Sequence, residues 1–278
     1  VVYAAGPPGA RSAQGLAAAW LGAQARRRAR HRAAPMPVLQ VACVAQDLRH
    51  ARDPILVGHY ERDPIAAAEA VIDRDVVARE LTLREHLGLY PGPVGTATVV
   101  LVERNDEERR QGTRRGAVVP GLGAFGELSV AALTEAVRAA ALRYLLAVIE
   151  REPPVGTEGV REVRLCSLLL GHNSAAAISI EDSVQALVRG VLEANRQFAQ
   201  SLSGRMRARI VRLEIVECSI DVAISAAKAL RGVARRLAAD EALFGMQIVA
   251  EEVLRQGPGV RPRLEVLSQR GYWPQLIV

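Results

Sequence analysis

Apolar and polar residues follow two different periodicities along this chain. Residues 38–45 are almost continuously apolar, and 96–102 are rich in β-branched side chains, so both segments predict buried strands. The same criteria predict further strands at 55–60, 116–120, 162–170 and 209–217, and a last pair at 263–267 and 275–278.

Between these segments apolar residues recur every three or four positions, which is the spacing of one helix face. The longest such face runs through 129–149. Further helices are predicted at 64–75, 179–199, 221–237 and 241–254. Asp63 before Pro64 is typical of a capped helix start, so the first of these helices is expected to begin there. The charged stretch 103–115 is expected to be an exposed loop.

Alternating strands and helices predict an α/β fold with three layers, α/β/α, around a mixed, mostly parallel sheet that is covered on both faces. One such domain is expected over 38–278. Residues 1–37, with the arginine-rich block 26–32, are expected to be a basic extension or linker. Val1 at the first position and the apolar end 273–278 favour a piece of a larger protein.

Composition narrows the class of protein. The chain has 278 residues, of which 50% are hydrophobic and 24% charged, and its net charge is +6. No apolar run reaches the roughly 18 residues of a membrane helix, and three cysteines are too few for a disulfide framework. We therefore expect a cytoplasmic protein without a membrane partner. All basic residues except Lys228 are arginine, but aromatic residues make up only 4%, so nucleic-acid binding is not expected.

Glycines follow one predicted strand at the place where α/β sheets bind ligands, outside the carboxyl ends of their strands. Gly121, Gly123 and Gly126 form a G-x-G-x-x-G pattern between a strand and a helix. Such a loop can hold a phosphate group by its backbone amides, or it can be a tight turn without a ligand. The next strand ends without a carboxylate and Glu127 adjoins the last glycine, so neither a dinucleotide nor another cofactor is expected.

Two other strand ends carry histidines. His59 and Tyr60 follow one strand, and His172, Asn173 and Ser174 follow another. These side chains could bind a ligand or supply a general base, or they could satisfy loop backbone groups. If the strands are parallel neighbours, these residues meet the glycine loop in one site. The candidate ligand-binding residues are His59, Tyr60, Gly121, Gly123, Gly126, His172, Asn173 and Ser174.

Catalytic residues are not specified by any motif. The chain lacks G-x-S-x-G, H-E-x-x-H and C-x-x-C patterns, so no nucleophile and no metal site are predicted. Cys166 and Cys43 lie within apolar strands and are expected to be inert core thiols. Whether the protein is an enzyme stays open at this point.

Residues 119–129, the helix 132–146 and the segment 178–198 resemble the non-catalytic N-terminal domain of the leucyl aminopeptidase family. The resemblance implies a macro-domain-like three-layer fold. The family's catalytic lysine and aspartates have no counterpart here, because Lys228 lies in an alanine-rich helix. The resemblance therefore implies the fold without the peptidase activity.

Residues 54–60 and 87–93 are similar to segments that precede the caspase-like CHAT peptidase domain in long bacterial proteins. This resemblance implies an accessory or sensing module whose partner is a domain of the full-length protein.

Three hypotheses follow from the sequence. The first is a non-catalytic ligand-binding or regulatory module of a larger bacterial protein, with a small anionic ligand at the three strand ends. The second is a hydrolase or transferase that uses His172 or His59 as general base on a phosphate-containing or nucleotide-like substrate. The third is an interaction domain in which the glycine loop serves packing alone.

Overall fold

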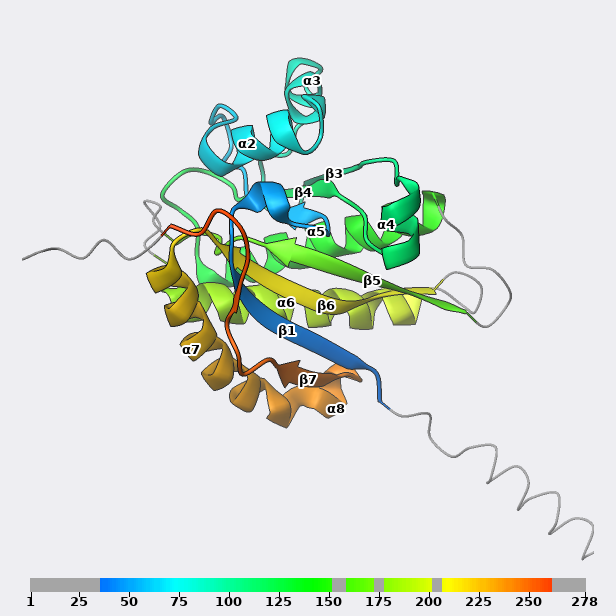
Figure 1. Cartoon of the computed structure of the whole chain (residues 1–278), viewed down its shortest axis with the longest axis vertical. Helices are drawn as coiled ribbons and strands as arrows, with labels where there is room; N and C mark the ends of the chain where they lie inside the picture. The colour runs from blue at the N-terminus through cyan, green and yellow to red at the C-terminus, as the bar shows by residue number, and fades with distance from the viewer. Residues whose placement is uncertain (1–35, 152–158, 173–177, 202–206, 262–278) are drawn as a thin grey trace, which may run out of the picture. The chain divides into compact units, whose positions relative to one another are not determined.

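Eight strands form one sheet in the computed structural model, which describes residues 36–151, 159–172, 178–201 and 207–261 (Figure 1). The strand order is β3-β4-β2-β5-β6-β1-β7, and β8 pairs with β1 beside β7. The neighbours run parallel except β3, which is antiparallel to β4. The predicted α/β class with a mixed, mostly parallel sheet is confirmed.

The strands are β1 (Val38–Ala45), β2 (Ile55–Leu56), β3 (Ala97–Leu101), β4 (Gly116–Pro120), β5 (Val160–Ser167), β6 (Arg207–Glu217), β7 (Gln247–Ala250) and β8 (Arg255–Gln256). The helices are η1 (Leu48–His50), α2 (Ala67–Asp75), α3 (Glu80–His86), α4 (Asp106–Gln111), α5 (Val130–Arg151), α6 (Ile180–Ser201), α7 (Ile220–Leu237), η2 (Ala238–Asp240) and α8 (Glu241–Phe244).

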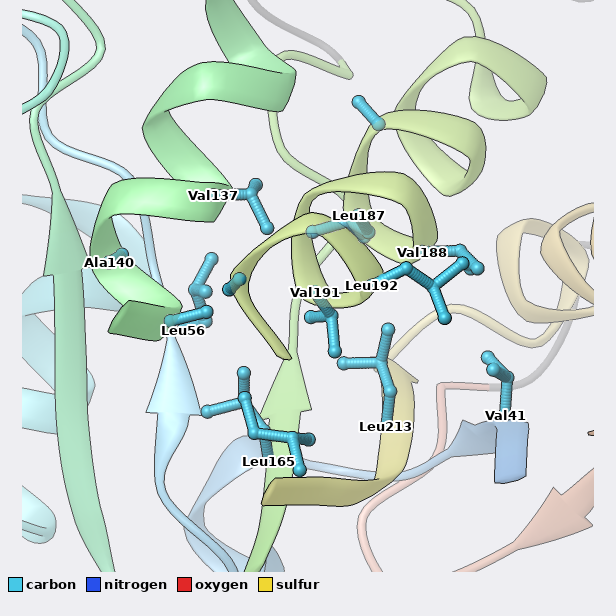
Figure 2. Close-up of a cluster of buried hydrophobic side chains, with 14 of the residues drawn as sticks. Val41, Leu56, Val137, Ala140, Leu165, Leu187, Val188, Val191, Leu192 and Leu213 are labelled. Atoms are coloured by element: carbon cyan, nitrogen blue, oxygen red, sulfur yellow. The ribbon is translucent and has the colours of Figure 1, made fainter. Parts of the chain in front are cut away.

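The main hydrophobic core lies between the sheet and the helices α5, α6 and α7, which cover one face (Figure 1). Strand side chains such as Leu165 and Leu213 point toward Leu187 and Val191 of α6 (Figure 2). All four are fully buried. The predicted apolar face of α5 packs into this core, which explains the helical spacing of its apolar residues.

A second, smaller core lies on the opposite face. Ile55 and Val57 point to this side while Leu56 points to the main core, as alternation along a strand requires. Ile72 of α2 and Leu81 of α3 cover them and are fully buried. The fold therefore has three layers, with a second helical layer smaller than the first.

Part of this second face carries a ring of charges instead of an apolar core. Arg212 Nε donates to Glu214 at 2.7 Å, and its Nη2 donates to Glu251 at 2.6 Å. Arg255 closes the ring through Glu214 at 2.6 Å and Glu251 at 3.2 Å. Each carboxylate thus meets two guanidinium groups, and the ring ties the β7–β8 segment to the middle of the sheet.

Asp53 lies beside this charged face, immediately before β2, and is 6% exposed. Burial raises the pKa of its carboxyl to about 6, although the nearby Arg164 guanidinium opposes the shift. The ionised form of Asp53 is therefore disfavoured in the folded protein.

Several predicted boundaries were wrong for local reasons. Helix α2 begins at Ala67 because Asp63 closes a turn, its amide donating to the Tyr60 carbonyl at 3.2 Å. Segment 103–115 contains the short helix α4, which Asn105 and Glu108 cap reciprocally.

The predicted helix 241–254 was also wrong. It ends after four residues at Gly245, whose φ of +65° is left-handed, and β7 follows. Helix α3 was not predicted. Residues 1–35 of the predicted extension 1–37 and the predicted strands 263–267 and 275–278 lie outside the described residues, so the division into an extension and one domain stays a prediction.

We expect Gly190→Ala to destabilise the fold, because Gly190 lets α6 approach α5 closely. An added methyl carbon would lie 2.7 Å from Val137 Cγ1 and 2.9 Å from the Thr134 carbonyl oxygen. The overpacking should cost about 1 to 3 kcal/mol and outweigh the roughly 1 kcal/mol gained in helix propensity. Urea unfolding measures this change.

Gly232→Ala on α7 is the matched control, since the atom nearest to its added methyl carbon would be Arg236 Nη1 at 3.6 Å. Without a clash, the propensity gain should stabilise the protein by up to about 1 kcal/mol. Equal effects of the two substitutions would contradict the close α5–α6 packing.

Asp53→Asn should remove one pH dependence of stability. Because the folded pKa of Asp53 lies above its ordinary value of 3.8, the unmodified protein loses stability as the pH rises from about 4 to about 6. Between pH 4 and pH 7, the unfolding free energy of the unmodified protein should fall by roughly 2 to 3 kcal/mol relative to that of Asp53→Asn. Urea unfolding at both pH values measures it, and a constant difference would refute the assignment.

Candidate functional site

Two of the three predicted strand ends meet directly at the carboxyl edge of the sheet. β2 lies between β4 and β5, and the pairing of β2 with β4 continues past Leu56. The His59 amide donates to the Pro120 carbonyl at 3.0 Å, and the Leu122 amide donates to the His59 carbonyl at 2.8 Å. His59 therefore lies beside the start of the glycine loop.

The third strand end lies close to the same loop. A Cβ atom on Gly171 would be 3.2 Å from Leu128 Cδ2, just after the glycine loop. His172 is partly exposed and is absent from the lining of the pocket that contains His59. Asn173 and Ser174 lie outside the described residues, so their predicted roles stay predictions.

The first part of the glycine loop packs against the turn 92–96. The amide of Gly121 donates to the Thr96 carbonyl at 3.0 Å, and that of Gly123 to the Gly92 carbonyl at 2.8 Å. A Cβ atom on Gly121 would lie 2.4 Å from the Pro93 carbonyl oxygen. Both amides are occupied by the 92–96 turn, so these two amides are not available to hold a phosphate group, and the tight-turn interpretation accounts for Gly121 and Gly123.

Two other predicted residues lie outside the lining of the pocket that contains His59. Tyr60 packs against the main core, and its ring meets Phe125 edge-on with centroids 5.3 Å apart. Gly126 has a φ of +86°, a conformation that glycine adopts readily and that the loop needs before α5. Neither residue lines the pocket beside His59.

A hydrogen-bonded cluster surrounds the His59 side chain. His59 Nδ1 lies 3.1 Å from Glu69 Oε2, and the Tyr90 hydroxyl donates to Glu69 Oε1. The rings of His59 and Tyr90 meet edge-on, with centroids 4.7 Å apart. His59 is 5% and Glu69 6% exposed, so the carboxylate is buried with a donor on each oxygen.

The contact with Glu69 places a proton on one nitrogen of His59. An ionised carboxylate only accepts hydrogen bonds, so beside it Nδ1 of His59 is the donor, and in the neutral imidazole Nε2 is then an acceptor. Burial raises the pKa of Tyr90 well above its usual value, and the Glu69 carboxylate adds to the shift. The phenol thus remains a hydrogen-bond donor.

His59 and Tyr90 open into a pocket of about 330 Å³ at this edge. Three carboxylates line it, those of Glu61, Asp63 and Glu85, whereas Arg62 is its one lining guanidinium. An excess of negative charge repels an anion and favours a cation. The predicted small anionic ligand therefore does not suit the pocket in which His59 lies.

Unusual backbone conformations accompany the cluster. Four residues at or near the ends of α2, which carries Glu69, have φ values between 47° and 68°. They are Arg62, Ala67, Ala78 and Arg79, of which Ala67 is the first residue of α2. Such conformations cost about 1 to 3 kcal/mol each and persist only where surrounding contacts impose them. One such contact is Asp73, whose carboxylate accepts the Leu81 amide at 2.8 Å at the start of α3.

Glu69 and Tyr90 were not predicted as site residues. Glu69 lies within the predicted helix 64–75, where a single glutamate reads as a solvent-facing charge. Tyr90 belongs to a turn sequence, Tyr90-Pro91-Gly92-Pro93. Neither spacing is a motif, so no sequence signal joins these residues to His59.

No cluster of three or more histidine, cysteine or acidic side chains suited to a metal ion occurs within the described ranges. Nor does any helix of the described part combine the length and hydrophobicity needed to cross a membrane.

Comparison with known proteins gives no assignment. No family model and no curated protein matches the chain. Among solved structures it is similar to an alphavirus P23pro-zbd (TM-score 0.39, 12% identity, 76% of this chain and 25% of that one). It is also similar to the bottromycin maturation enzyme BotP in complex with Mn (0.34, 22%, 70% and 30%) and to a mutant tomato leucine aminopeptidase (0.36, 11%, 72% and 37%).

The chain spans 25 to 37% of the length of these structures. An aminopeptidase is thus among the structural neighbours, but scores below 0.5 carry no argument about ancestry or activity. Neither the macro-domain likeness nor the CHAT link has support from a sequence family.

Glu69→Gln should lower the stability of the protein, because it removes the carboxylate charge that His59 and Tyr90 contact. The amide NH₂ would also place a donor opposite one of these two groups, where the carboxylate has an acceptor. The expected loss is about 1 to 3 kcal/mol in unfolding free energy. Nitrogen-detected NMR of the imidazole should show the Nδ1–H form in the unmodified protein and a tautomer mixture in Glu69→Gln.

Glu61→Gln is the control, since Glu61 is an exposed carboxylate of the same pocket. It should change stability by less than about 0.5 kcal/mol. Unchanged stability and an unchanged tautomer in Glu69→Gln would show that the carboxylate does not orient His59.

Proposed function

We propose that this chain is a non-catalytic ligand-binding module of a larger protein, and that its site is the His59 pocket at the carboxyl edge of the sheet. The observation that carries the proposal is the acidic lining around a buried His59–Glu69–Tyr90 cluster. The lining carboxylates suit a cationic group, and Nε2 of His59 suits a hydrogen-bond donor.

Binding is favoured over covalent catalysis by the side chains around the pocket. Its lining contains no serine, threonine or cysteine. Cys43 and Cys166 are buried, and burial raises both thiol pKa values, that of Cys43 to about 12. These thiols are therefore poor nucleophiles near neutral pH.

The regulatory part of the proposal rests on the CHAT-like segments. Residues 54–60 contain His59, and 87–93 contain Gly88 and Tyr90, so both segments contribute to the pocket. A ligand that bound there would contact the two stretches that resemble CHAT-associated proteins. We propose that occupancy of the pocket is transmitted to a partner domain of the full-length protein.

A second candidate is a hydrolase with His59 as general base on a water molecule. It is favoured by one observation, the 3.1 Å contact that orients the imidazole through Glu69. The acidic lining disfavours the phosphate-containing substrate expected from the sequence. Turnover of p-nitrophenyl acetate that falls at least tenfold in His59→Gln would favour this candidate over the binding module.

Agmatine, which carries a guanidinium and an amine, is the probe for the proposed site. We expect it to shift the backbone amide signals of His59, Gly88 and Gly92 in NMR titrations, with a dissociation constant of about 1 mM or tighter. Glu85→Gln and Asp63→Asn should each weaken binding roughly two- to fivefold, because each removes one partly exposed charge contact.

Glu80→Gln is the control for charge, since Glu80 lies on the same helix as Glu85 but outside the pocket lining. It should leave the agmatine affinity unchanged. The proposal fails if agmatine at about 10 mM moves none of these amides, or if ADP-ribose moves the same amides more strongly.

A further inference from the structure

Exposed leucines gather at the end of α3, the helix that projects furthest from the sheet in Figure 1. Leu83, Leu87 and Leu89 lie within seven residues of one another, and each is between 51% and 66% exposed. Leu83 and Leu87 are one helical turn apart and therefore share a face of the helix. Exposed apolar side chains that lie together, unlike scattered ones, are typical of a surface that contacts another molecule.

The backbone at the end of α3 holds these leucines in place. The Gly88 amide donates to the Glu85 carbonyl at 3.0 Å, and the Leu89 amide donates to the Arg84 carbonyl at 2.8 Å. Together with the left-handed φ of Gly88, +67°, these bonds form a Schellman motif. The motif often pairs apolar residues at the positions of Leu83 and Leu89, yet both remain more than half exposed. The local turn therefore does not account for them by shielding them.

The exposed leucines adjoin the His59 pocket along the chain itself. Gly88, which separates Leu87 from Leu89, lines that pocket, and so do residues 90–93. Val94 follows directly and is exposed as well. We refer to Leu87, Leu89 and Val94 as the apolar rim of the pocket. A molecule that entered the pocket and extended out of it along this segment would meet the rim.

The carboxylates of the pocket are not neutralised by direct contact. Among the residues that the structure describes, Glu61, Asp63 and Glu85 form no ion pair within 4.0 Å. The nearest guanidinium groups are those of Arg62, in the same lining, and of Arg79, which lines a neighbouring pocket with Glu85. Neither of them is bound to the three carboxylates. A basic side chain from another molecule would therefore find unpaired carboxylates here.

We propose that the His59 pocket and its apolar rim together bind a segment of a partner protein that carries one arginine or lysine between apolar side chains. The basic group enters the acidic pocket, and its apolar neighbours cover Leu87 and Leu89. Charge complementarity selects the basic residue, and the rim selects the residues beside it. This inference rests on the function proposed above and identifies the ligand as a peptide segment.

Three acetylated tripeptide amides, Leu-Arg-Leu, Gly-Arg-Gly and Leu-Gln-Leu, test the two parts of the surface separately. We expect Leu-Arg-Leu to bind roughly fivefold or more tightly than either of the others, because it alone engages both the carboxylates and the rim. In NMR titrations of the unmodified protein, Leu-Arg-Leu should shift the amide signals of Leu87, Leu89 and Val94, whereas Gly-Arg-Gly should shift mainly those of the pocket lining. This measurement requires no variant to fold.

Leu87→Ser and Leu89→Ser should each reduce the preference for Leu-Arg-Leu over Gly-Arg-Gly by roughly threefold or more, because each removes apolar contact area from the rim. Glu85→Gln should instead weaken both arginine peptides. Leu243→Ser is the matched control, since Leu243 is 58% exposed on α8 and lies outside the pocket lining. It should change the preference by less than about twofold.

Agmatine separates this inference from the proposed function on which it rests. If agmatine binds but Leu-Arg-Leu binds no more tightly than Gly-Arg-Gly, the inference is overturned and the function stands. If neither agmatine nor any peptide binds, both are overturned. Equal binding of Leu-Gln-Leu and Leu-Arg-Leu also overturns the inference, because the carboxylates would then select nothing. So does a dimer in analytical ultracentrifugation that Leu87→Ser dissociates, since the rim would then be covered by a second copy of this chain.

Discussion

The parallel pairing of β2 with both of its neighbours is the constraint on which the rest of the structure depends. β2 has two residues, but it lies between β4 and β5 and so joins the β3–β4 pair to the other strands. Hydrogen bonds extend its pairing in both directions, from the Pro54 carbonyl, which accepts the Cys166 amide at 2.8 Å, to the His59 amide. A seven-residue segment thus fixes Asp53 at one edge of the sheet and His59 at the other.

A buried carboxyl group lies near each end of this segment, Glu69 beside His59 and Asp53 at the other end, and the two have different hydrogen-bond partners. Glu69 is satisfied internally, with one donor on each carboxylate oxygen, and it orients His59 at the cost of several left-handed residues in the adjoining chain. Asp53 receives no such pair of donors, and burial raises its pKa to about 6. The first arrangement is a preorganised cluster, whereas the second is a buried carboxyl whose ionised form is disfavoured.

The sequence predicted the fold well because hydrophobic periodicity decides it. Continuous apolar strands such as 38–45 and the periodic helix α5 were located within a few residues, since burial on both faces of a sheet leaves a clear pattern. The helix predicted over 241–254 is wrong because Gly245 interrupts the helical pattern. The residues of β7 then pair with β1, and this pairing overrides their local preference for a helix.

The site was predictable only in part. Neighbouring parallel strands brought His59 next to Gly121, as their positions at strand ends implied. The roles of the glycines could not be read correctly, because the partner of the loop is the turn 92–96, and no pattern links the two segments. Glu69 comes from a different segment than His59, and the neighbouring arginines Arg104, Arg114, Arg161 and Arg164 also come from separated segments, so only the folded chain shows which of these side chains lie close together.

The opposite charges at the two ends of β2 have a consequence beyond either pocket. Carboxylates outnumber guanidinium groups in the lining of the pocket beyond its carboxyl end, and arginines outnumber carboxyl groups in the lining of a pocket at its amino end, so the residue types of the two linings differ in the sign of their charge. Charged side chains of a partner would act differently on the two linings before any contact forms, within the roughly 10 Å over which salt leaves electrostatic forces effective. Approaching partners of opposite sign would therefore meet opposite edges of the same sheet.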